Sequence, residues 1–316
     1  MKNRILVLGA TGFVGRLVVK ALAASDWAEP VAASRRAGNG VERVDGADAV
    51  SLGAALAKVD GLINCVAGSP ETISANARAL RSALEAQNAT RASPLPVVYL
   101  SSMAVYGTAE GRIDEDAPLA GASPYGLAKV EAEQLLGTLP RVTLLRPGCI
   151  YGRGSPQWSV RIADLLKAKR IGDLGAAGDG HSNLVHVDDV VQAALLALQT
   201  PAAGGRAYNL AMPDSPRWNA YFIAYGRALG ATPVPRIGAR RMKVETKLLA
   251  PALKIAEILG RKAGVHHLPP ALAPSLARLW QQDIRLDVRR VEQELGLKWT
   301  ALPGALQQEA AAKTTA

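Results

Sequence analysis

A set of glycines near the start of the chain most restricts what this sequence can fold into. The apolar segment 4–8 ends in Gly9, Gly12 and Gly15, and apolar residues then recur at helical spacing over 13–22. This order predicts a strand, a tight turn and a helix. Glycine lets the turn approach a pyrophosphate closely, and free N–H groups at the helix start attract its charge. Although the G-x-x-G-x-x-G spacing departs by one residue from the usual dinucleotide fingerprint, this placement favours dinucleotide binding over a plain structural turn.

The alternation of apolar strand-like runs with helical periodicity continues beyond this turn. We expect strands at 30–34, 61–65, 96–100, 142–145 and 207–210, and helices at 73–86, 124–136 and 186–198. This alternation is typical of an α/β fold, a Rossmann-type doubly wound parallel sheet covered by helices on both faces. Only the segment 41–44 is too short and polar to be predicted as a strand.

The character of the chain changes after about residue 151. A glycine-rich loop at 172–182 is followed by the last predicted helix and strand of the sheet, and the chain beyond 211 is mainly helical and rich in proline. We therefore predict a dinucleotide-binding domain over 1–150, completed by about 184–211. A smaller, mostly helical substrate-binding lobe is expected to comprise 151–183 and 212–316.

Composition narrows the class of protein. The 316 residues are 49 % hydrophobic and 20 % charged, which is typical of a folded, soluble chain. The first residues imitate a secretory signal, but the glycines interrupt it and no stretch reaches the roughly 20 apolar residues of a membrane span, so we expect a cytoplasmic protein. Cys65 and Cys149 lie in apolar runs without ligands at metal spacing, which predicts buried, reduced thiols and no metal site.

The net charge of +10 would also suit a protein that binds nucleic acid or an anionic membrane. The basic residues are scattered, without a long run and without interleaved aromatic residues. A solvated surface together with an anionic cofactor and substrate explains the charge better than nucleic acid or a membrane does.

The end of the second predicted strand bears on which dinucleotide is bound. An NAD site usually offers an acidic residue there for the ribose 2′-hydroxyl, but this chain has Ser34, Arg35 and Arg36. A guanidinium can bind a 2′-phosphate through charge-assisted hydrogen bonds, whereas a carboxylate would repel it. The sequence therefore favours NADP over NAD, against the alternative that the arginines are a solvated loop pair.

A serine, a tyrosine and a lysine form the candidate catalytic set. Tyr125 and Lys129 lie four residues apart in the predicted helix 124–136, so they share one face. A phenol with its ordinary pKa of about 10 transfers protons poorly at neutral pH. Because a nearby ammonium and a positive nicotinamide favour the phenolate, we expect the pKa of Tyr125 to be lowered. Ser102 follows the strand 96–100 at its carboxyl end, where its hydroxyl can hold a substrate oxygen.

These residues carry a resemblance to the extended short-chain dehydrogenase/reductase family, often called the NAD-dependent epimerase/dehydratase family. The segments that resemble it occur in the family's order: GATGFVG at 9–15, SSMAVYG at 101–107, YGLAK at 125–129, LLRPGCIYG at 144–152, HVDD at 186–189 and YNLA at 208–211. They cover roughly residues 1–215, and the C-terminal hundred residues match mainly in layout. The resemblance implies a nicotinamide cofactor and dimerisation through the helix that carries Tyr125.

The resemblance also implies further cofactor contacts by position. Asp45 and Gly46 would lie near the adenine, Val66 and Ala67 near the dinucleotide backbone, and Pro147 and Ile150 near the nicotinamide. Together with the features above, the predicted cofactor-binding residues are Gly9, Thr11, Gly12, Phe13, Val14, Gly15, Ser34, Arg35, Arg36, Asp45, Gly46, Val66, Ala67, Tyr125, Lys129, Pro147 and Ile150.

Departures from the family pattern narrow the chemistry that the resemblance implies. Sugar-nucleotide 4,6-dehydratases carry an Asp-Glu pair where this chain has Met103 and Ala104, and the fucose-synthase type carries a cysteine at the first of these positions. Many nucleotide-sugar members place an arginine a few residues before the HVDD motif, where this chain has 180–183, Gly-His-Ser-Asn. This weakens the case for a nucleotide-diphosphate sugar, although Arg153 or Arg161 could compensate.

Four other features have alternative interpretations. Aromatic residues at helical spacing over 218–225 predict a core of the lobe, with an apolar substrate pocket as the alternative. His266 and His267 predict a surface loop. The residues 186–189 predict a capped helix start. The apolar and basic segment 242–261, interrupted by a proline, predicts a lid or subunit contact at least as well as a membrane-surface helix.

Three functions remain open from the sequence. The leading hypothesis is an NADP-dependent oxidoreductase that transfers hydride to or from a carbonyl or secondary alcohol of a small-molecule substrate, with Ser102, Tyr125 and Lys129 as catalytic residues. The nearest alternative is an NAD(P)-dependent epimerase of a sugar or nucleotide sugar. A non-enzymatic NADP-binding sensor is the alternative from another class, because a fold does not dictate an activity.

Overall fold

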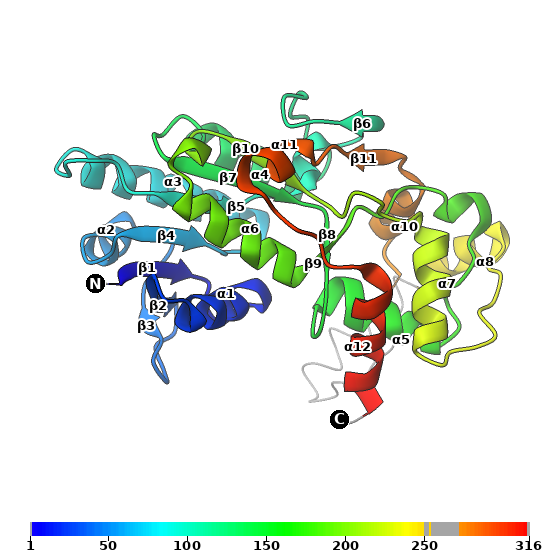
Figure 1. Ribbon diagram of the computed structural model, residues 1–316. Helices are drawn as coiled ribbons and strands as arrows, with labels where there is room; N and C mark the ends of the chain where they lie inside the picture. Colours follow the sequence, from blue (N-terminus) through cyan, green and yellow to red (C-terminus); the bar gives the residue numbers. More distant parts are fainter. Residues whose placement is uncertain (1, 250–252, 254–271, 315–316) are drawn as a thin grey trace. The chain divides into compact units, whose positions relative to one another are not determined.

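The computed structural model describes residues 2–249, 253 and 272–314 (Figure 1). The chain divides into two compact units. The first unit contains the segments Met1–Gly148, Val185–Pro213 and Leu286–Trp299, and the second contains Cys149–Leu184, Asp214–Arg285 and Thr300–Ala316.

A seven-stranded sheet forms the centre of the first unit. Its strand order is β10-β7-β5-β4-β1-β2-β3, and the neighbouring strands run parallel. The order reverses between β1 and β4, which is the switch point of a doubly wound sheet. This confirms the Rossmann-type fold predicted from the sequence. The strands are β1 Asn3–Leu8, β2 Ala28–Ser34, β3 Glu42–Arg43, β4 Gly61–Asn64, β5 Val97–Leu100, β7 Val142–Pro147 and β10 Ala207–Leu210.

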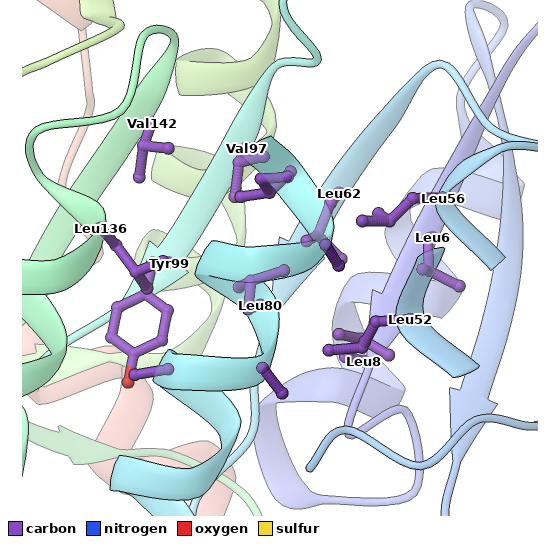
Figure 2. Packing of buried hydrophobic residues seen from close by; sticks show 14 of the residues in the cluster. Leu6, Leu8, Leu52, Leu56, Leu62, Leu80, Val97, Tyr99, Leu136 and Val142 are labelled. Atoms are coloured by element: carbon purple, nitrogen blue, oxygen red, sulfur yellow. The ribbon is translucent and has the colours of Figure 1, made fainter. Parts of the chain in front are cut away.

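Helices cover both faces of this sheet. On one face α2 (Ala49–Leu56), α3 (Pro70–Asn88) and α4 (Pro124–Leu136) pack side by side, while α1 (Phe13–Ala24) packs against α6 (Val187–Gln199). Figure 2 shows the core beneath the first group, where Leu6 and Leu8 of β1 and Tyr99 of β5 lie among side chains of those helices. Alternate residues of a buried parallel strand face opposite layers, so every position of β1 from Ile5 onward is apolar.

Three short elements and the helix α11 also belong to the first unit. A 3-10 helix, Met103–Tyr106, and the strand β6, Gly111–Ile113, follow β5. A second 3-10 helix, Pro201–Ala203, precedes β10, and α11, Arg289–Leu295, comes from near the end of the chain.

The second unit is mainly helical, with an aromatic core. Trp218, Tyr221, Phe222 and Tyr225 of α7 are fully buried, and Trp218 lies 6.2 Å from Trp280 between ring centroids. This confirms that the aromatic stripe is core of the lobe. The elements are β8 Cys149–Tyr151, a π-helix at Pro156–Val160, α5 Arg161–Lys167, a 3-10 helix at Gly175–Gly178, α7 Trp218–Ala228, α8 Ala239–Val244, a π-helix at Glu245–Leu249, α10 Pro274–Gln281 and α12 Leu302–Thr314. Two strands, β9 Leu184–His186 and β11 Ile284–Leu286, lie at the boundaries of the units.

The structure differs from the sequence-based boundaries in two places. The segment 41–44, which the sequence did not predict as a strand, contains β3 at the edge of the sheet. The segment Leu286–Trp299, which the sequence assigned to the lobe, groups with the sheet unit, where Glu294 accepts a hydrogen bond of 2.8 Å from the hydroxyl of Tyr208. Both depend on tertiary pairing that leaves no periodic apolar signal.

Some sequence predictions concern parts of the chain that the structure does not describe. Residues 242–249 of the apolar and basic segment belong to α8 and the π-helix after it, and most of 250–261 lies outside the described residues, as do His266 and His267. None of the helices within the described ranges combines the length and hydropathy needed to cross a membrane. Across the same ranges, no three His, Cys, Asp or Glu side chains are grouped so as to hold a metal ion.

Candidate active site

The turn after β1 has a geometry that requires glycine at two positions. Gly9 adopts a φ of +75°, and a Cβ there would lie 2.9 Å from the carbonyl oxygen of Cys65. A Cβ on Gly15 would lie 2.2 Å from the carbonyl oxygen of Gly9. The turn is therefore closed tightly onto the first turn of α1, and side chains are kept out of it.

The start of α1 fits an anion better than the starts of its neighbours do. Asp48, Ser69 and Ser123 cap α2, α3 and α4 with side-chain oxygens. At α1 the cap residue is Gly12, and no side chain accepts from the first N–H groups. These donors and the helix dipole suit a pyrophosphate oxygen, so this turn fits the dinucleotide that the sequence predicts.

The end of β2 presents two arginines beside that turn. Ala10 N donates to Ala33 O at 3.1 Å, which joins the glycine turn to the end of β2. The hydroxyl of Ser34 donates to Arg36 O at 2.6 Å and so shapes the bend that follows. Arg35 and Arg36 are exposed, and neither guanidinium forms an ion pair in the described parts of the chain. Their charges are available to a phosphate group.

Two buried asparagines, Asn64 and Asn76, connect the other predicted cofactor loops. Asn76 Nδ2 donates to Gly46 O at 2.8 Å, and its Oδ1 accepts from Asn64 Nδ2 at 2.7 Å. Asn64 Oδ1 in turn accepts from Val66 N at 3.0 Å. The structure thus brings Gly46 and Val66 together, with exposed Asp45 and Ala67 beside them. Sequence reasoning missed both asparagines, although a polar residue ending a buried run such as Asn64 is a usable signal.

The two serines after β5 have different surroundings. Ser101 is buried, and its hydroxyl donates to Glu133 Oε1 at 2.5 Å. Ser102 Oγ accepts from Ala104 N at 3.2 Å, and its hydroxyl is near enough to Tyr125 to lower the pKa of that phenol. Ser102 is therefore the serine that stands beside the phenol, as the sequence predicts.

Tyr125 lies in the first turn of α4 and Lys129 lies one turn later. Tyr125 is partly exposed, yet its hydroxyl is enclosed enough that burial raises its pKa, while the neighbouring Ser102 hydroxyl lowers it by less. The sequence led us to expect a lowered pKa, and in this structure that expectation is wrong. The reason is that burial dominates the pKa of this phenol, while the Lys129 ammonium points to a different acceptor.

That acceptor is the main chain at the end of β5. Lys129 Nζ donates to Leu100 O at 2.6 Å, lies 3.5 Å from the hydroxyl of Tyr99, and stands 4.7 Å from the centroid of the Tyr99 ring. Its side chain is only 2 % exposed, and burial lowers its pKa to about 8. Sequence reasoning missed Tyr99, because an aromatic residue in a buried strand has an ordinary role in a core.

About two thirds of the chain matches a known protein family. Residues 5–211 match the sequence pattern of the NAD dependent epimerase/dehydratase family. The chain belongs to this family. The match confirms the family expected from the motifs, and it ends before α7, so most of the second unit lies outside it.

Individual relatives are distant or match only in part. Protein YeeZ of Escherichia coli K12 is 32 % identical over 139 residues, which are 43 % of this chain and 47 % of that protein, so the chain spans about half the length of this relative. The N-acetyl-alpha-D-glucosaminyl-diphospho-ditrans,octacis-undecaprenol 4-epimerase of Escherichia coli O157:H7 is 27 % identical over 230 residues, 66 % of this chain and 67 % of that enzyme. The structure of human epimerase family protein SDR39U1 with NADPH superposes with a TM-score of 0.74 at 18 % identity, covering 98 % of this chain and 99 % of that one.

The remaining predicted cofactor residues of this family member are divided between the units. Pro147 ends β7 in the sheet unit, and Gly148 N after it donates to Leu210 O at 2.9 Å. Ile150 lies on β8 in the second unit. Both cysteines are free thiols: Cys149 is buried, as expected, whereas Cys65 is only half-buried.

Proposed function

We propose that this chain transfers hydride between NADP and the carbonyl or secondary alcohol of a small-molecule substrate, with Ser102, Tyr125 and Lys129 as its catalytic residues. The arrangement that carries the proposal places Ser102 directly after β5 and Tyr125 in the first turn of α4, near enough that the serine hydroxyl lowers the pKa of the phenol. In a doubly wound sheet, ligands bind at the carboxyl ends of the strands. The glycine turn after β1 and the arginines after β2 lie at the same end of this parallel sheet.

The chain's own groups have distinct tasks in this reaction. A bound nicotinamide dinucleotide supplies or accepts the hydride. Ser102 Oγ holds the substrate oxygen by a hydrogen bond, and Tyr125 Oη gives that oxygen a proton during reduction or removes one during oxidation. Because burial raises the pKa of Tyr125, its hydroxyl is protonated at neutral pH, which suits proton donation to a carbonyl.

The preference for NADP rests on the charge at the end of β2. Arg35 and Arg36 are exposed cations next to a bend that Ser34 shapes. A ribose 2′-phosphate carries charge that these guanidinium groups can bind, and no carboxylate stands at 34–36 to accept a ribose 2′-hydroxyl instead. NAD is the alternative cofactor.

An epimerase activity is the second candidate, favoured by the distant likeness to the 4-epimerase of undecaprenyl-diphospho-N-acetylglucosamine. In an epimerase the same hydride is removed and returned, so the cofactor is not consumed. The catalytic residues would be the same, and only the substrate would differ.

Cofactor consumption separates these functions. Purified protein is incubated with NADPH and a panel of aldehydes, ketones and keto-sugars, and oxidation of NADPH is followed together with product. We expect steady oxidation with at least one carbonyl, and a loss of about 10²–10⁴-fold in kcat for Tyr125→Phe. Tyr208→Phe is the matched control, since it removes a hydroxyl that donates to Glu294 instead. Product without NADPH oxidation would indicate the epimerase, and unchanged turnover in Tyr125→Phe would refute the catalytic assignment and favour a sensor.

A further inference from the structure

The buried ammonium of Lys129 has no direct ionic partner. Its Nζ contacts Leu100 O and Tyr99, and within the described residues it makes no ion pair with a carboxylate. An ammonium taken out of water is destabilised unless an anion or several acceptors compensate it. The charge state of Lys129 therefore depends on groups farther away.

Glu133 is the carboxylate one turn farther along α4, and it is buried with 4 % exposure. Arg146 of β7 holds it with Nη2 at 2.6 Å from Oε2 and Nε at 3.0 Å from Oε1, and Ser101 donates to Oε1 at 2.5 Å. Arg146 is itself fixed by the hydroxyl of Tyr106 and the carbonyl oxygen of Glu115, each at 2.8 Å. The carboxylate is thus clamped in place and cannot turn away to solvent.

The other titratable groups near Lys129 are Cys65 after β4 and Tyr99 of β5, and Tyr125 lies one turn earlier on α4. Burial raises the pKa of the Cys65 thiol to about 12 and also raises the pKa of both phenols, so all three are neutral near pH 7. Glu133 is therefore the anion that opposes the desolvation of Lys129, and it raises the pKa of the lysine against the larger effect of burial.

We propose that Glu133 is a positioning residue for the reaction, a clamped buried anion that keeps the ammonium of Lys129 charged while Ser101 and Arg146 hold it in place. The inference rests on the proposed function, because the lysine matters to turnover only if it serves the site at Tyr125. On this proposal, the ion pair between Glu133 of α4 and Arg146 of β7 helps to set the pH range over which the enzyme is active.

A purely structural ion pair is the alternative. A buried pair of this kind can join a helix to a strand without any effect on a neighbouring lysine. The two roles differ in one measurable quantity, the pKa of Lys129. A structural role changes stability alone, whereas a positioning role changes the protonation of the lysine as well.

The test is a titration of Lys129 in Glu133→Gln. The protein is labelled with ¹³C at lysine Cε, Lys129→Met identifies the signal, and its chemical shift is followed against pH by NMR. We expect the pKa of Lys129 to fall by about one unit or more. The alkaline pH at which kcat declines is expected to move down by the same amount. Glu131→Gln is the matched control, the same change on the same helix at a half-exposed glutamate that pairs with Arg78.

A second variant keeps the test possible if Glu133→Gln does not fold. Glu133→Gln leaves Arg146 as an unpaired buried charge, so the double variant Glu133→Gln with Arg146→Met, which removes both charges, is titrated as well. If Glu133→Gln folds, a lowered pKa of Lys129 in that variant supports the inference and an unchanged pKa overturns it. If it does not fold, the same two outcomes are applied to the double variant. If the pKa of Lys129 falls but the pH at which kcat declines does not move, Glu133 does hold the charge of Lys129, and the catalytic role proposed for Lys129 is wrong.

Discussion

Lys129 Nζ on α4 donates a hydrogen bond of 2.6 Å to the carbonyl oxygen of Leu100, the last residue of β5. This contact ties the helix that carries Tyr125 to the strand that leads into Ser102. The lysine therefore sets the register between the two halves of the candidate catalytic set, in addition to any effect of its charge. The contact also takes the charge of Lys129 out of water.

The buried cation makes stability depend on pH in the alkaline range. Burial lowers the pKa of Lys129 from an ordinary value of 10.5 to about 8. Between these values the unfolded chain binds more protons than the folded one, so the free energy of unfolding rises with pH. Relative to Lys129→Met, we expect the wild-type chain to gain about 2–3 kcal/mol between pH 7.5 and 10.5. Urea unfolding of both proteins across this range measures the gain; a constant difference would contradict it.

The arginines after β2 are expected to distinguish the two cofactors. Arg35→Ala and Arg36→Ala each remove one charge-assisted hydrogen bond to a 2′-phosphate, worth about 1.5–3 kcal/mol. We therefore expect the Kd for NADPH to rise about tenfold to a hundredfold while the Kd for NADH changes little, measured by fluorescence titration. Lys20→Ala removes the same charge from an exposed position on α1 and serves as the control. An equal loss for both cofactors would show that the arginines do not bind the phosphate.

Alanine at Gly15 is expected to damage the turn that receives the pyrophosphate. Its Cβ would lie 2.2 Å from Gly9 O, so the turn and α1 must move apart. We expect a loss of about 1–3 kcal/mol in stability, and weaker binding of NADPH and NADH alike. The control is Gly53→Ala in α2, where nothing lies within 4 Å of the new Cβ and alanine is expected to stabilise the helix by about 0.5–1 kcal/mol. Unchanged cofactor binding in Gly15→Ala would argue against this turn as the site.

The carboxyl of Asp287 is expected to make the free energy of unfolding depend on pH in the acid range. Hydrogen bonds from Arg289 and Arg112 hold the pKa of this buried carboxyl well below its usual range. A carboxyl with a lowered pKa stabilises the fold above its unfolded pKa of about 4 and loses that contribution as pH falls further. Because both guanidinium groups are largely exposed, we expect Asp287→Asn to cost only about 1–2 kcal/mol at pH 7.

The measurement for Asp287 is thermal or urea unfolding at pH 7 and at pH 3. The difference between wild type and Asp287→Asn is expected to shrink at the lower pH, because there the carboxyl is largely protonated in the unfolded chain while it stays ionised in the folded protein. Asp26→Asn, at an exposed position, should show no difference at either pH. A difference that persists undiminished at pH 3 would contradict the ionic explanation.

The sequence by itself determined the helices, strands and motifs that depend on patterns of nearby residues. The predicted helix 124–136 coincides with α4, because Ser123 and Pro124 begin it and the apolar positions repeat at helical spacing. The parallel sheet followed from buried strands that alternate with helices, and the family followed from motifs in a fixed order. Local periodicity and capping chemistry are properties of consecutive residues, so a sequence can reveal them.

Only the tertiary structure decided which distant residues surround the candidate site. It aimed Lys129 at Leu100 rather than at the hydroxyl of Tyr125, clamped Glu133 between Ser101 and Arg146, and joined the segment that contains Asp287 to the sheet unit. Along the chain, Glu133 and Arg146 lie 13 residues apart, and Arg112 and Asp287 lie 175 residues apart. Burial and electrostatics depend on such distances in space, which no spacing along the chain encodes, and that is why the direction of the Tyr125 pKa could not be predicted from its neighbours in sequence.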